Sequence, residues 1–178
     1  KPVVLEVGVS GGDLKSQVEF VLGLIGKKVK FTEVFKSGMY VDVLGITKGK
    51  GFEGVITRFG VKRKQHKSRK TVREVGVIGP WHPAAVMYTI PRAGQMGFHQ
   101  RTETGKRILL VGNATSNPIT PAGGFEHFGN VAGDYAVVGG SVPGPASRFV
   151  MVRLKVRGFS KSQAPPQVLE VSTMARRR

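Results

Sequence analysis

The stretch "MYVDVLGITKGKGFEGVI", residues 39–56, predicts two β-strands around the glycine-containing bend "TKGKG". Side chains alternate between the two faces of a strand. Val41 and Val43 would therefore share one face, with Asp42 and Leu44 on the other. This pattern places a β-sheet at the centre of the fold.

The bend is glycine-rich because Gly49 and Gly51 permit a tight turn and close approach of another backbone. It does not match a nucleotide-binding phosphate loop, since the glycine spacing is wrong and Lys50 is followed by glycine instead of Ser or Thr. We interpret it as a bend that carries Lys48 and Lys50 toward a phosphate backbone. An ordinary hairpin turn is the alternative, and the two interpretations are compatible.

Extended segments are predicted on both sides of this stretch, at residues 3–9, 29–35, 107–112, 135–145 and 149–157. The last of these, "FVMVRLKVR", has the clearest alternation. One face would carry Val150, Val152, Leu154 and Val156, and the other Arg153, Lys155 and Arg157. Because no acidic residue accompanies these three cations, we favour phosphate contact over simple solvent exposure.

One helix is predicted at about residues 13–25, with Asp13 as its N-cap and Gly26 as its C-terminal stop. Its apolar residues fall at helical spacing on one face, and we interpret it as structural: Leu14, Val18, Val21, Leu22 and Ile25. A second, short helix is an option at residues 82–89.

Many short strands, glycine turns and one helix predict a mainly β fold, a small barrel with a long inserted irregular finger. Residues 1–57 and 105–157 would form the barrel body, and residues 58–104, where the strand pattern fails, the finger. Residues 158–178 would be an extended basic tail.

The charge of the chain indicates a polyanionic partner. Its 178 residues include 28 Lys and Arg against 11 Asp and Glu, a net charge of +17. Nucleic acid is the first candidate and an anionic membrane surface the second. No apolar run approaches the ~18 residues of a membrane span, and no strong amphipathic basic helix supports surface binding.

The absence of cysteine excludes disulfides, zinc fingers and thiol catalysis, and fits a reducing compartment. The chain starts at Lys1 without a visible signal peptide, so we expect a fragment or a processed piece.

The positive charge is concentrated in two regions. Residues 54–107 carry a net +10 and residues 148–178 a net +7, while residues 108–147 carry −2. Residues 58–73 alone hold eight Lys or Arg and no acidic residue. An ordinary solvated surface mixes the two signs, so this segment is not explained by solubility.

The segment after this basic run, residues 76–103, contains Trp81, the only tryptophan of the chain. Glycine and proline flank it on both sides, so a core position is the less favoured reading. Across residues 58–107, the basic residues interleave with aromatic, histidine and amide side chains: Phe59, Trp81, His82, Tyr88, Gln95, Phe98 and His99. Cations neutralise phosphates and aromatic rings stack on unpaired bases, so the pattern favours folded RNA as the partner.

No catalytic or metal-binding constellation is visible. The four histidines, 66, 82, 99 and 127, are not spaced as a metal pair and no carboxylate cluster accompanies them. No serine has a nucleophile-elbow context. We therefore predict neither enzyme activity nor a cofactor.

A set of residues at fixed spacing carries a family resemblance: Phe35, Asp42, Gly45, Thr47, Gly49, Lys50, Gly51, Gly54 and Arg58. The segments "GPWHPA", "AGQMG", "HQRTE" and "GSVPGP" extend it over nearly the whole chain. The chain resembles the universal ribosomal protein L3 family of the large subunit, in its archaeal and eukaryotic form. Members of this type are nearly twice as long, so the resemblance implies that an N-terminal half is missing.

The resemblance implies a translation-protein-type β-barrel near the subunit surface and a finger that reaches toward the peptidyl transferase centre, with Trp81 at its tip. It implies a structural, non-enzymatic protein that binds ribosomal RNA early in assembly and contacts neighbouring large-subunit proteins. A cytoplasmic location in the ribosome follows, without a membrane or small-molecule substrate.

The predicted RNA-binding residues combine these arguments: Lys48, Lys50, Arg58, Lys62, Arg63, Lys64, His66, Lys67, Arg69, Lys70, Arg73, Trp81, His82, Arg92, Gln95, His99, Arg101, Lys106, Arg153, Lys155 and Arg157. Two alternatives remain open from the residues alone. One is a free-standing RNA-binding or ribosome-assembly module, which cofractionation with mature subunits would distinguish. The other is an enzyme acting on nucleic acid, which would need a carboxylate cluster or metal ligands.

Overall fold

The computed structural model describes residues 2–158 and 164–172. Its main element is an antiparallel sheet with the strand order β5-β4-β1-β6. The four strands are β1 (Tyr40–Ile46), β4 (Gln100–Asn113), β5 (Asp134–Val138) and β6 (Val150–Leu154). The mainly β character predicted from the sequence is confirmed.

The core is small and lies on one face of β1. Val41 and Val43 are fully buried there, as their alternation predicted, together with Ile108 of β4 and Phe35. Partly buried side chains surround these four: Phe31, Met39, Val111, Val150 and Val152.

Asp42 is also buried, although it lies on the opposite face of β1, and a β-bulge explains this. Between Val41 and Val43 the register with β4 shifts, so that β4 carries an extra residue there. Gly105 occupies the bulge at φ +67°, a backbone conformation that glycine tolerates best. Its N–H donates to Asp42 Oδ1 at 3.0 Å, and the Val156 N–H donates to Asp42 Oδ2 at 3.3 Å. The carboxylate thus ties β4 and the end of β6 to β1.

The predicted small barrel is not confirmed by residues 2–158 and 164–172. The sheet is open, with β5 and β6 as its edges. Closing a sheet into a barrel requires its edge strands to pair with each other, and β5 and β6 do not pair here.

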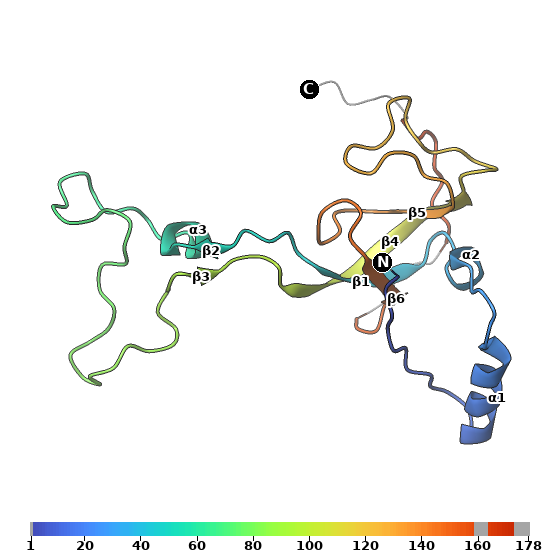
Figure 1. The fold of residues 1–178 in the computed structure, drawn as a ribbon, viewed down its shortest axis with the longest axis horizontal. Coiled ribbons are helices and arrows are strands. Elements are labelled where there is room, and N and C mark those ends of the chain that lie inside the picture. Colours follow the sequence, from blue (N-terminus) through green and yellow to red (C-terminus); the bar gives the residue numbers. More distant parts are fainter. Residues whose placement is uncertain (1, 159–163, 173–178) are drawn as a thin grey trace.

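Three helices form in the described part of the chain, where one was predicted. α1 (Leu14–Leu24) confirms the predicted helix, and Gly26 at φ +74° follows its end. Asp13 takes the N-cap position, but its side chain makes no capping hydrogen bond. No residue of α1 is buried, and Figure 1 shows the helix standing away from the sheet. No helix of the described residues is long and apolar enough to cross a membrane.

Two predicted extended segments adopt other conformations. Residues 31–34 form α2 (Phe31–Val34), where the rings of Phe31 and Phe35 stack with centroids 4.7 Å apart. This contact joins positions four residues apart, which lie on one face of a helix. Residues 3–9 form no strand, because no neighbouring strand pairs with their backbone.

A projecting ribbon extends β1 and β4 beyond the sheet (Figure 1). Thr47 N–H donates to His99 O at 3.0 Å, and Lys50 N–H donates to Met96 O at 2.9 Å. The pairing continues into β2 (Phe52–Glu53) and β3 (Gly94–Gln95), and α3 (Val55–Phe59) follows β2. We call residues 47–59 and 94–100 the shaft.

The shaft corrects the predicted path of the chain. The segment "TKGKG" does not form a hairpin, because the strands on its two sides pair with β3, β4 and β6 and not with each other. Part of the finger predicted as irregular is this ribbon. Its partners lie about fifty residues apart, which local periodicity cannot reveal.

Beyond the shaft, residues 60–93 divide into two lobes without helix or strand (Figure 1). We call residues 60–75 the cationic lobe and residues 76–93 the tryptophan lobe. The optional helix at residues 82–89 is not formed. A segment this short is unstable as an isolated helix, and all its residues are exposed, so no packing supports it.

Candidate nucleic-acid interface

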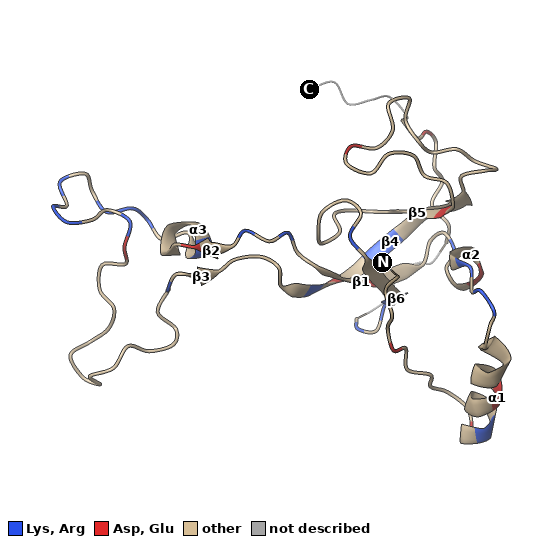
Figure 2. Ribbon diagram, in the orientation of Figure 1, with Lys and Arg blue, Asp and Glu red and all other residues tan. Residues whose placement is uncertain are grey.

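The cationic lobe gathers positive charge at the far end of the shaft (Figure 2). A hydrogen bond from Lys64 N–H to Val72 O, 3.0 Å long, closes it into a loop. Lys64 Nζ lies 3.8 Å from Glu74 Oε2, but both groups are solvent-accessible and such pairs contribute little. The structure gathers here eight predicted RNA-binding residues: Lys62, Arg63, Lys64, His66, Lys67, Arg69, Lys70 and Arg73.

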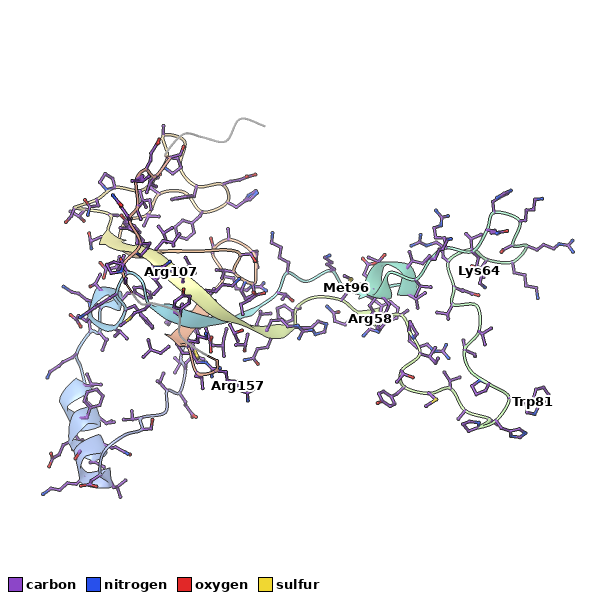
Figure 3. The ribbon with its side chains drawn as sticks, turned by 180° about the vertical axis from the view of Figure 1, so that it is seen from behind. Arg58, Lys64, Trp81, Met96, Arg107 and Arg157 are labelled. Atoms are coloured by element: carbon purple, nitrogen blue, oxygen red, sulfur yellow. The ribbon has the colours of Figure 1, made fainter. Side chains whose placement is uncertain are left out.

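The tryptophan lobe presents aromatic side chains to solvent. Trp81 is 87% exposed and Tyr88 is 96% exposed, and His82 is exposed as well. Figure 3 shows Trp81 and Lys64 on separate lobes. Trp81 is therefore not a core residue. Large exposed apolar groups of this kind are typical of contact surfaces.

Amide hydrogen exchange should separate the lobes from the shaft in the free chain. Few backbone hydrogen bonds lie within residues 60–93, so we expect rapid exchange there and protection only when RNA binds. The paired amides of Thr47, Lys50 and Met96 should exchange more slowly and serve as the internal reference. Strong protection of residues 76–89 without RNA would contradict this expectation.

Arg58 links the two sides of the finger through hydrogen bonds. Its Nη1 donates to Arg92 O at 2.7 Å and its Nε donates to Gln95 O at 3.2 Å. The guanidinium also lies over the ring of Phe59, 5.1 Å from its centroid. A Cβ at position 94 would stand 3.0 Å from the guanidinium, so Gly94 leaves room for it. Arg58 therefore holds α3 against the returning strand, a structural role that its charge alone did not predict.

Further predicted RNA-binding residues meet along the shaft. Lys48, Lys50, Gln95, His99 and Arg101 line a cavity of about 530 Å³ together with Arg58 and Phe59. Close backbone packing forms one wall, because a Cβ at Gly97 would overlap the carbonyl oxygen of Lys48. Phe59 is not among the predicted RNA-binding residues, although it is one of the aromatic side chains that interleave with the basic residues of this region.

The turn at residues 139–148 contacts the end of the shaft next to the sheet. Its main contact residue, Arg148, is not among the residues selected from the sequence. Arg148 Nη1 donates to Thr47 O at 3.2 Å, and the guanidinium lies 5.4 Å from the ring centroid of Phe98. Pro143 packs against Gly45, where a Cβ would approach its ring to 3.1 Å. Cations on the body can thus fix the shaft as well as contact a partner.

The predicted RNA-binding residues of the body do not form one free row. Lys106 Nζ lies 3.0 Å from Glu103 Oε2, and Arg153 Nε lies 3.6 Å from the buried Asp42. Lys155 Nζ lies 5.7 Å from the ring centroid of Tyr40. Arg157 is exposed, beyond the end of β6. Phosphate binding by these four residues stays a prediction.

Other features lie apart from this interface. A larger cavity of about 940 Å³ is lined by residues from two segments, 119–126 and 131–138, and by Val171 and Ser172, and none of its lining residues is lysine or arginine. In the part of the chain that the structure covers, no group of His, Asp and Glu could hold a metal ion. Of the predicted basic tail, residues 159–163 and 173–178, with the closing arginines, lie outside the described residues.

Comparison with known proteins supplies the family. The family model described as "Ribosomal protein L3" matches residues 1–174. The chain is 42% identical to the large ribosomal subunit protein uL3 of Methanocaldococcus jannaschii, over 99% of the chain and 53% of that protein. It is 44% identical to the uL3 proteins of Methanococcus vannielii, over 97% of the chain, and of Nanoarchaeum equitans, over 91%.

These matches confirm the family predicted from the residues at fixed spacing. The chain spans about half the length of the curated relatives it matches, 53%, 52% and 49% of the three proteins named. The family model nevertheless covers almost all of the chain itself. The chain belongs to the ribosomal protein L3 family.

Proposed function

We propose that the chain is a structural component of the large ribosomal subunit that binds ribosomal RNA through its shaft and two lobes. The observation that carries this proposal is the finger itself. It projects from the sheet and ends in two lobes, one with exposed cations and the other with an exposed tryptophan. Such a finger is suited to a space between RNA helices, because its cations lower the repulsion between phosphate backbones.

The finer parts of the proposal follow from the family. The finger would reach toward the peptidyl transferase centre, with Trp81 stacking on unpaired bases. The protein would act in the cytoplasm beside neighbouring large-subunit proteins. It would support assembly without performing catalysis. Closure of the sheet into a barrel would need further strands beside β5 and β6.

Replacement of Trp81 by alanine tests the role of the tryptophan lobe. A base stacked on the ring contributes about 1–3 kcal/mol, which is small beside the many phosphate contacts proposed. Trp81→Ala should therefore leave the protein in reconstituted large subunits but change tRNA accommodation or antibiotic response. The melting temperature of the free chain should not change, because the side chain is 87% exposed.

Tyr88→Ala is the matched control, since Tyr88 is an equally exposed aromatic side chain of the same lobe. A core tryptophan would behave differently, because its truncation costs about 3–5 kcal/mol of fold stability. A large drop in melting temperature together with loss of incorporation would contradict the proposal. Exclusive recovery of the protein outside mature subunits would favour the free-standing assembly module.

A further inference from the structure

The shaft contains a feature that RNA binding in general does not require: the cavity bounded by the shaft strands and the end of α3, which we call the shaft groove. Its walls include Lys48, Lys50, Arg58, Phe59, His99 and Arg101. Its volume of about 530 Å³ falls within the ~300–1,000 Å³ typical of sites for small molecules. A groove of this size fits one nucleotide and not a duplex.

The charge of the groove fits an anion. Lysine or arginine supplies four of its side chains, and no aspartate or glutamate belongs to its lining. Among the described residues, none of these four cations forms an ion pair. Lys48, Lys50 and Arg101 are exposed, so their charges are available to a phosphate group.

The groove also offers a prepared aromatic surface. Arg58 is held in place by its hydrogen bonds to Arg92 O and Gln95 O, and it lies over the ring of Phe59. The ring is still 54% exposed, which leaves area for a second planar group. A guanidinium on one side of a ring and a base on the other is a favourable stack. Because these hydrogen bonds hold the Arg58 side chain in place before RNA binds, little conformational entropy is lost when the stack forms.

From these observations we propose that the shaft groove binds a single unpaired nucleotide of RNA. Its base stacks on Phe59, and Lys48, Lys50 and Arg101 contact its flanking phosphates. This inference rests on the proposed RNA-binding function and assigns a nucleotide-scale site within it. Phosphate contacts along the lobes would supply the bulk of the affinity, and the groove would select positions where one base leaves the helical stack.

Two RNA hairpins test the site with the full 178-residue chain. They share one sequence, except that one carries a single bulged 2-aminopurine, whose fluorescence falls when the base stacks on an aromatic ring. The wild-type chain should quench this fluorescence and bind the bulged hairpin more tightly. Phe59→Leu removes the aromatic face without changing charge. It should abolish the quenching and weaken binding of the bulged hairpin about fivefold or more, without changing binding of the paired hairpin.

Phe52→Leu is the matched control, because Phe52 is a 79% exposed phenylalanine of the same ribbon outside the groove. It should keep both the quenching and the preference for the bulged hairpin. A double variant, Lys48→Gln with Lys50→Gln, should reduce the preference for the bulged hairpin independently of the ring. Circular dichroism and melting temperature verify that each variant is folded.

The outcomes separate this inference from the proposed function. Equal behaviour of Phe59→Leu, Phe52→Leu and wild type would overturn the nucleotide site, while salt-dependent binding of both hairpins would still support RNA binding. Binding of neither hairpin by the wild-type chain would overturn the proposed function. Adenosine monophosphate that relieves the quenching as effectively as unlabelled bulged hairpin would show a site for free nucleotides and would overturn the assignment to RNA.

Discussion

Replacing five cations of the cationic lobe with glutamine should lower the affinity for large-subunit ribosomal RNA on the order of a thousandfold at low salt. The five are exposed and lie at the far end of the finger: Lys62, Arg63, Lys67, Arg69 and Lys70. Each phosphate contact releases counterions and adds roughly 0.7–0.9 to the slope of log affinity against log salt. The slope should therefore fall by about 3.5–4.5 if all five contact phosphates.

A charge-matched control separates local contacts from overall charge. Glutamine at five exposed lysines around α1 and α2 removes the same net charge: Lys15, Lys27, Lys28, Lys30 and Lys36. We expect this control to keep most of the affinity and of the salt slope. Binding titrations between 50 and 200 mM salt, roughly the range over which such complexes weaken most visibly, supply both quantities. Equal losses in the two variants would contradict a specific role for the cationic lobe.

Asp42→Ala should destabilise the sheet by several kcal/mol. Asp42 is buried and accepts hydrogen bonds from the N–H groups of Gly105 and Val156. Both hydrogen bonds are partly buried, and a buried donor left without a partner costs about 1–3 kcal/mol, a large fraction of the ~5–15 kcal/mol that stabilises a typical domain. The lost contact with Arg153 adds little, because that side chain is about half exposed. Urea unfolding followed by circular dichroism measures the change.

Asp13→Ala serves as the matched control. Asp13 is exposed, and its side chain makes no capping hydrogen bond, so the change should stay within about 0.5 kcal/mol of wild type. Asp42→Asn keeps one acceptor oxygen, so its free energy of unfolding should lie between those of Asp42→Ala and Asp13→Ala. An unfolding midpoint of Asp42→Ala close to that of wild type would contradict the role of the carboxylate in fixing the bulge.

Local signals predicted the elements whose cause is local. Periodicity predicted α1, and alternation predicted β1 with its buried Val41 and Val43. The same alternation located the clearest part of β6 (Val150–Leu154), although the predicted segment continued to residue 157. Beyond Leu154 one more backbone hydrogen bond forms, from Lys155 N–H to Tyr40 O at 3.1 Å, and the ladder ends there because β1 begins at Tyr40.

Long-range pairing was beyond such signals. In the shaft, Thr47 pairs with His99, and no residue type near either position indicates that the two pair. The open sheet and the exposed α1 depend on which strands are present and which surfaces meet. The residue pattern within one helix or strand does not show which other strands are present or which surfaces pack together. The predicted strand at residues 3–9 failed for the same reason, since a suitable sequence still needs a neighbour.

The sequence predicted which types of residue form the candidate site, but not how the individual side chains are placed and what they contact. The eight cationic and imidazole side chains at residues 62–73 do gather in one lobe, and Trp81 is exposed. In contrast, the structure uses Arg58 and Arg148 to hold backbone carbonyls of the shaft. A positive charge in the sequence does not show whether an arginine holds the backbone or contacts a phosphate, because its guanidinium donates hydrogen bonds both to backbone carbonyls and to phosphate oxygens.

Photo-crosslinking from the two lobes inside purified large subunits tests the central claim most directly. A photoreactive amino acid at position 67 would report on the cationic lobe, one at position 81 on the tryptophan lobe, and one at position 15 of α1 would be the control. We expect positions 67 and 81 to crosslink to ribosomal RNA, with position 81 mapping near the peptidyl transferase centre. Subunits that contain the protein but show crosslinks from both lobes only to other proteins would contradict the account.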